Sequence, residues 1–170
     1  MVIGRMVQKP SASMELIMAF REVKELLAEI DVYPYHGSVL VEDAGESDPD
    51  TQIVPNGRQW GDPGSVSASQ HSIQVVTISA DIVDGIVRDV AVRVYRRGSE
   101  SGLGTLIFDG FLNLTVPALA IGELLAESEF LRRVDVGHTG RTRIQIFAQN
   151  TVPELQDEPD SPTDLNILVD

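Results

Sequence analysis

Hydrophobic and polar residues alternate in short runs between residues 38 and 148, and this period of two constrains the fold more than any other feature. Ile144 and Ile146 alternate with polar side chains in one run, and Val90, Val92 and Val94 do so in another. Successive side chains of a strand point to opposite faces, so each run buries one face. Runs of this kind every eight to twelve residues or so, broken by Gly and Pro, are typical of two packed sheets. We therefore predict a mainly β fold, an antiparallel β-sandwich of about seven or eight strands.

Residues 11–30 follow a different period. Apolar side chains recur there every three or four positions, and Ser13 and Glu15 suit the first turn of a helix. This pattern predicts one N-terminal amphipathic helix, packed on the domain or bound to a partner. Its apolar positions are Met14, Leu16, Ile17, Phe20, Val23, Leu26, Leu27 and Ile30. Residues 121–133 fit either a strand or a helix.

Negative charge is concentrated in two segments of a chain whose net charge is −13. Residues 42–64 carry six acidic side chains and one basic one, and residues 151–170 carry six acidic side chains and none that is basic. The first segment is rich in Gly, Pro and Asp and exceeds the usual connection of about four to six residues. We therefore predict one domain over residues 1–150 with an acidic loop at 42–64, followed by a flexible acidic tail over residues 151–170.

The tail ends in a β-prone segment that contains Leu165, Ile167, Leu168 and Val169. A purely solvated end has little use for these side chains, so we expect them to be buried. They would dock on the chain's own sandwich, or add a strand to the sheet of a neighbouring subunit and form a homo-oligomer. The arginines of segments 88–97 and 132–143 would either receive the acidic tail or remain solvated surface charge.

No motif for catalysis or for a cofactor is present. His36, His71 and His138 are isolated in the sequence, so no pair is spaced to share a helical face around a metal. The segment ESDPD supplies carboxylates that suit Ca²⁺ but lacks the spacing of an EF-hand, which favours a solvated acidic loop. We therefore expect no enzymatic activity, no cofactor and no metal site.

The composition also bears on partners and location. An acidic chain without a Lys/Arg cluster repels a nucleic-acid backbone, so we expect no nucleic-acid partner. No apolar run approaches the roughly 18 residues of a membrane span, and the N-terminus lacks the apolar core of a secretory signal. The chain has no cysteine, so it needs no oxidising compartment. We expect no membrane association and a cytoplasmic location.

The order of the β-prone blocks resembles that of small acidic β-sandwich proteins of actinobacteria, among them immunity-type proteins of toxin systems and nuclease-inhibitor-like relatives. The resemblance covers roughly residues 33–148, and neither the N-terminal helix nor the acidic tail belongs to it. It implies a sandwich fold and an inhibitory role toward a partner protein. The matching residues are Val90, Val92 and Val94, then Leu119, Ile121 and Gly122, and finally Gly140, Arg141, Arg143 and Ile144.

The leading hypothesis is a non-enzymatic protein-binding module, an immunity-type inhibitor that binds a basic partner protein through its acidic loop. Asp43, Glu46, Asp48 and Asp50 would supply negative charge that steers the partner. Trp60 would either anchor the interface or fold back to pin the loop to the sandwich. The alternative is a structural or assembly protein whose C-terminal arm adds a strand to a neighbouring subunit.

Overall fold

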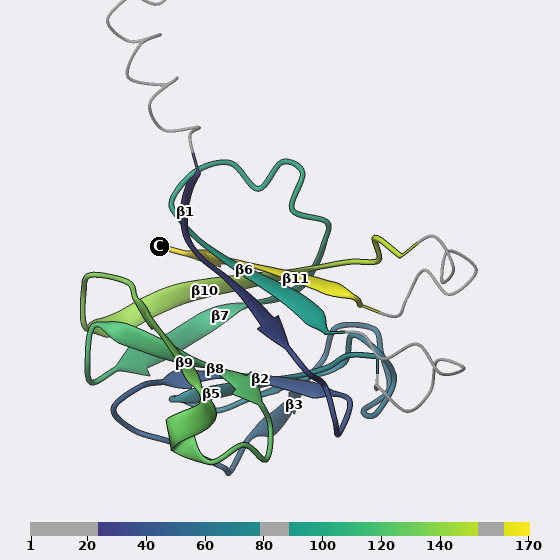
Figure 1. Ribbon diagram of the computed structural model, residues 1–170, viewed down its shortest axis with the longest axis horizontal. Coiled ribbons are helices and arrows are strands. Elements are labelled where there is room, and N and C mark those ends of the chain that lie inside the picture. The colour runs from purple at the N-terminus through teal and green to yellow at the C-terminus, as the bar shows by residue number, and fades with distance from the viewer. Residues whose placement is uncertain (1–23, 79–88, 153–161) are drawn as a thin grey trace, which may run out of the picture.

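The computed structural model describes residues 24–78, 89–152 and 162–170, and the described chain is built almost entirely of strands (Figure 1). The elements are β1 (Glu25–Val32), β2 (Ser38–Asp43), β3 (Gln52–Val54), β4 (Val66–Ala68), β5 (Ser72–Val76), β6 (Val90–Arg96), β7 (Thr105–Leu114), β8 (Ala118–Glu123), the 3-10 turn η1 (Ser128–Phe130), β9 (Arg132–Asp135), β10 (Gly140–Gln149) and β11 (Asp164–Val169).

These strands form two layers. Sheet A has the order β1-β6-β11-β10-β7, and sheet B has the order β3-β4-β5-β2-β8-β9. The predicted mainly β, two-sheet architecture is confirmed. The described residues hold eleven strands rather than seven or eight, because two short strands, β3 and β4, fall inside the predicted acidic loop and just after it, and because β1 and β11 also belong to sheet A. Sheet A is mixed, since β11 runs parallel to β6 and antiparallel to β10.

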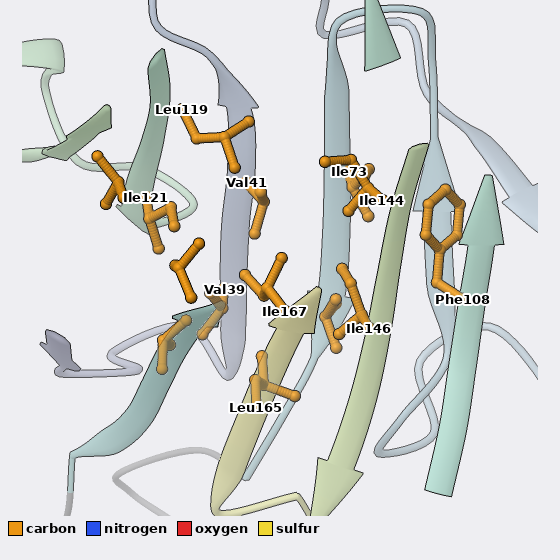
Figure 2. Close-up of a cluster of buried hydrophobic side chains, with 14 of the residues drawn as sticks. Val39, Val41, Ile73, Phe108, Leu119, Ile121, Ile144, Ile146, Leu165 and Ile167 are labelled. Atoms are coloured by element: carbon orange, nitrogen blue, oxygen red, sulfur yellow. The ribbon is translucent and has the colours of Figure 1, made fainter. Parts of the chain in front are cut away.

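The core lies between the inner faces of the two sheets, where fully buried aliphatic side chains of both layers face one another (Figure 2). Val39, Val41 and Ile73 come from sheet B, and Ile144 and Ile146 come from sheet A. Alternation explains their placement, since in β6 every second side chain is buried, beginning at Val90. Burial of each such side chain stabilises the fold by roughly 1.5–3 kcal/mol.

The end of the chain is a central strand, which corrects the prediction of a flexible tail over the whole of residues 151–170. All six residues of β11 are buried. Leu165, Ile167 and Val169 belong to the core between the sheets, and Leu168 packs on the other face of sheet A against Leu103 and Phe147. Asp164 and Asn166 are polar although buried, so the sequence of this segment did not distinguish a central strand from a peripheral one.

A carboxylate fixes the start of β11. Asp164 accepts hydrogen bonds from the hydroxyls of Thr151 and Thr163 and pairs with Arg93 of β6 at 3.0 Å. Burial acts to raise the pKa of Asp164, but these hydrogen bonds and the arginine outweigh it and hold that pKa below its ordinary value. One arginine of the 88–97 segment therefore does receive an acidic residue of the tail.

The predicted N-terminal helix is wrong where the structure describes it. Residues 11–23 lie outside the described part of the chain, and Glu25–Val32 forms strand β1, paired with β6. The segment ELLAEI consists of good helix formers, but its pairing with β6 and the burial of Ile30 and Val32 override that local preference. The ambiguous residues 121–133 prove to be the end of β8, the turn η1 and the start of β9. No helix in the described ranges is long and apolar enough to span a membrane.

Candidate functional site: the acidic edge of sheet B

The acidic loop follows one edge of sheet B. It leaves β2 at Asp43, forms the edge strand β3, and returns to the sheet at β4. We call the exposed part of this segment, residues 46–62, the acidic edge. Its two ends lie at opposite ends of β5, because Asp48 donates its N–H to Ser72 Oγ and Gly61 donates its N–H to Ser65 Oγ, next to Val76.

Two of the six acidic side chains of the loop do not face solvent. Glu42 is buried and accepts hydrogen bonds from the hydroxyls of Ser47 and Ser72. Asp43 is buried and accepts hydrogen bonds from the hydroxyl and N–H of Thr115 and the N–H of Gly45. Asp43 was expected at the binding surface, but its side chain instead holds the loop to the turn after β7.

The electrostatics of Asp43 agree with this anchoring position. Burial acts to raise the pKa of its carboxyl group, whereas the hydrogen bonds from Thr115, Gly45 and Val116 act to lower it. The hydrogen bonds prevail, so the pKa of Asp43 lies below its ordinary value and the carboxylate is charged at neutral pH.

Three predicted residues do gather at the surface. Glu46 and Asp50 are exposed and Asp48 is half-buried, and Asp48 Oδ1 accepts the N–H of Asp50. His71 lies nearby, with its Nε2 atom 3.8 Å from a carboxylate oxygen of Glu46. The structure therefore brings Glu46, Asp48 and Asp50 together at the start of β5.

Strand β3 presents an open edge beside these carboxylates. Ser67 of β4 pairs with Ile53 on one side and with Gln74 of β5 on the other. The N–H of Ser69 donates to the C=O of Ser72. Because hydrogen-bonded pairs recur at every second residue of an antiparallel ladder, the N–H and C=O of Ser67 also point toward β5. The N–H and C=O of Ile53 therefore point away from β4, and its side chain is 59% exposed. Sequence reasoning missed Ile53, although the β-branched pair Ile53 and Val54 between turn signals was its signal.

Trp60 lies at the far end of the acidic edge. The four residue steps of β5 that separate the two ends span about 13 Å, so the structure does not place Trp60 among the three carboxylates. Its side chain is 39% exposed. Asp62, two residues further, is exposed and was not singled out from the sequence. Along the edge the three carboxylates are thus followed by the exposed side chains of Ile53 and Trp60 and then by Asp62.

The acidic edge differs from the outer face of sheet A in how its charges are balanced. Four of its side chains, Glu46, Asp48, Asp50 and Asp62, are acidic and one, Arg58, is basic. On sheet A three arginines, Arg93, Arg96 and Arg143, are paired with carboxylates, as in the 2.6 Å contact of Arg143 with Asp109. The acidic edge therefore carries a net charge of −3 from its five charged side chains, four acidic and one basic.

The other candidate residues do not form a site. Leu165, Ile167, Leu168 and Val169 are buried in the chain's own sheet A. His36 contacts Glu123, His71 contacts Asn113, and His138 contacts Thr142, so the three histidines lie in separate environments. In the part of the chain that the structure describes, no three His, Cys, Asp or Glu side chains are grouped to hold a metal ion.

No protein-family model matches the chain, and no curated protein matches it in sequence. Among solved structures, ComJ from Bacillus subtilis, an inhibitor of the DNA-degrading activity of NucA, matches with a TM-score of 0.55 at 10% identity, over 86% of this chain and 97% of ComJ. The structure of crocagin biosynthetic gene J matches with a TM-score of 0.47 at 14% identity, over 86% of this chain and 97% of that one. The likeness to ComJ shows a shared fold.

Proposed function

We propose that this protein is a non-enzymatic inhibitor that binds a DNA-degrading enzyme through the acidic edge of sheet B. The observation that carries the proposal is the row of surface carboxylates, Glu46, Asp48, Asp50 and Asp62, which outnumber the one arginine of the acidic edge, Arg58. The shared fold with ComJ, itself an inhibitor of a DNA-degrading activity, supports the same reading.

An enzyme that cleaves DNA must hold a polyanion, so its substrate cleft carries Lys and Arg side chains. A protein surface with an excess of carboxylates is complementary to such a cleft and competes there with the phosphates. Charge alone gives fast but weak association, whereas apolar contacts prolong the complex. Ile53 and Trp60 supply such contacts, and the open backbone edge at Ile53 supplies hydrogen-bonding groups.

The alternative of an arm exchanged between subunits has no comparable support. All six residues of β11 are buried between β6 and β10 of the same chain. To pair with a neighbour, β11 would first have to leave the centre of sheet A, which would open both of its ladders. A binding role for the exposed edge of sheet B requires no such rearrangement.

The proposal can be tested by DNA hydrolysis. Purified DNA-degrading enzymes from the same genome are assayed on a fluorescent duplex with and without an excess of the protein. We expect at least one enzyme to be inhibited, and the triple variant Glu46→Gln, Asp48→Asn, Asp50→Asn to require about tenfold more protein for the same inhibition, because electrostatic steering is lost. The matched control is Glu25→Gln, Asp89→Asn, Glu100→Gln, with the same change of charge at exposed positions on and beside sheet A.

Inhibition by the triple variant at the wild-type concentration would contradict the role of the acidic edge. Absence of inhibition of every enzyme tested, with the protein at tens of micromolar, would contradict the inhibitor assignment itself. The three substitutions keep the size of each side chain, so circular dichroism of the variant should match that of the wild type.

A further inference from the structure

A groove lies at the opposite edge of sheet B, lined by residues of β1, β8 and β9 and of the turns beside them. Strand β1 of sheet A passes over this edge and contacts β9 (Figure 1). The volume of the groove is about 210 Å³. Ile30, Val32 and Ile121 of the core supply apolar lining, while Tyr33 and Phe130 also line the groove. The groove therefore reaches down to core side chains, which are themselves almost fully buried.

The groove lies within a concentration of exposed apolar side chains. Phe130 is 68% exposed, Leu125 67%, Tyr35 57% and Tyr33 41%. All four come from two short connections, the turn after β1 and the turn between β8 and β9. Tyr33 and Phe130 line the same groove and Tyr35 stacks on Tyr33, and exposed apolar side chains gathered around a groove can mark an interaction site. We call these four residues and the groove the aromatic corner.

Specific contacts hold the corner in place. The rings of Tyr33 and Tyr35 are stacked with centroids 6.4 Å apart, and Tyr35 meets the ring of His36 edge-on at 4.8 Å. His36 Nδ1 lies 2.6 Å from Oε1 of Glu123, whose other oxygen accepts the N–H of Leu125. These contacts link the two connections to each other across the corner. A surface fixed before binding loses less conformational entropy when a partner arrives.

The size and charge of the corner select its occupant. Small-molecule sites usually have volumes of about 300–1,000 Å³, so a groove of about 210 Å³ suits a single large side chain better than a cofactor. Asp31 lines the groove, and Glu127 and Glu129 are exposed on the turn that carries Phe130. Arg132 is the one basic residue among the groove's lining residues. The surroundings are therefore net negative.

We propose that the aromatic corner is a second protein-binding site, which receives one large apolar side chain from a basic segment of a partner protein. The apolar side chain enters the groove between Tyr33 and Phe130, and Lys or Arg residues beside it meet Asp31, Glu127 and Glu129. Five strand spacings separate β9 from β3 in sheet B, or about 24 Å, so the corner is distinct from the acidic edge. The proposal does not depend on the identity of the partner that the acidic edge binds.

The test uses the ¹⁵N-labelled full chain and three synthetic peptides followed by NMR. The first peptide, acetyl-GKRFRKG-amide, has a central Phe between basic residues; the second replaces that Phe by Ala, and the third replaces the basic residues by Glu. We expect the first to shift the amides of Val32, Gly122, Ala126 and Phe130, and the other two to bind at least tenfold more weakly there. The variant Phe130→Ser should weaken the first peptide about tenfold, whereas Leu106→Ser, an exposed apolar residue of β7, should not.

Equal shifts from the Phe and Ala peptides would overturn the apolar anchor, and equal binding of the Glu peptide would overturn the role of charge. If the basic peptides shift only the amides of Asp48, Asp50 and Ile53, the aromatic corner is not a binding site while the acidic edge is. The two surfaces are thus tested separately in one spectrum.

Discussion

Replacement of Ile167 by alanine tests whether the last strand is central to the domain. Ile167 is fully buried in β11, opposite Ile146 of β10 and Val94 of β6. The substitution removes three carbon atoms, each contributing about 0.8 kcal/mol by burial, and leaves a cavity that neighbouring strands cannot close. Comparable buried substitutions cost about 2–5 kcal/mol. We therefore expect a loss of about 3 kcal/mol in the free energy of unfolding.

Urea denaturation followed by circular dichroism measures this loss, with Ile53→Ala as the matched control. Ile53 carries the same side chain in an edge strand but is 59% exposed, so its replacement should cost less than about 0.5 kcal/mol. With a slope near 2 kcal/mol per molar urea, the midpoint should fall by about 1.5 M for Ile167→Ala and by less than about 0.3 M for Ile53→Ala. Similar shifts for the two variants would refute the central position of β11.

Two further predictions concern individual residues. Asp164 has a pKa below its ordinary value in the folded protein, so its contribution to stability is present above pH 4 or so and is lost as the pH falls through the lower, folded value. Asp164→Asn should accordingly be less stable than the wild type at pH 7 and lose less stability on acidification. Urea midpoints of both proteins at pH 7, 4 and 3 measure this. Midpoints that fall equally with pH in the two proteins would contradict it. Gly104 has a φ of +106°, and a Cβ there would lie 2.5 Å from the carbonyl oxygen of Ala148. Gly104→Ala should therefore lower the free energy of unfolding by roughly 2 kcal/mol or more. The control Gly102→Ala, where φ is also positive but the space around the Cβ is open, should lower it by about 1 kcal/mol. Thermal unfolding measures both losses, and equal losses would rule out the steric clash at Gly104.

The core of the sandwich was predictable because its strands alternate. Val39 and Val41 in β2, and Val90, Val92 and Val94 in β6, each fall on one face of a strand that is buried on that face. The period of two contains this information directly, without knowledge of the neighbouring strands. Prediction succeeded for these strands because their valines recur at alternate positions.

Prediction failed where tertiary pairing decided the structure. The residues of β1 are as suited to a helix as to a strand, and only their ladder with β6 distinguishes the two. The sequence of β11 does not distinguish a central strand from a peripheral one, and its place between β6 and β10 depends on partners that are distant in sequence.

The binding surface was predictable in part for a similar reason. Charge density in the sequence located the acidic loop, but the sequence could not show that Asp43 turns inward to bond Thr115 while Glu46 and Asp50 remain outside. The aromatic corner depends on two connections about 90 residues apart, which only the His36–Glu123 contact and the groove between them bring together.

The central claim is that exposed carboxylates of the acidic edge capture a basic enzyme, and the dependence of the association rate on salt tests it most directly. The rate is measured by stopped-flow fluorescence with an enzyme that the protein inhibits, at 50 and 500 mM salt. We predict that the association rate of the wild type falls steeply as salt rises. The triple variant at Glu46, Asp48 and Asp50 should associate about tenfold more slowly than the wild type at 50 mM salt. At 500 mM the two rates should be nearly equal, because screening removes the difference. Equal rates for the two proteins at 50 mM salt would contradict the claim.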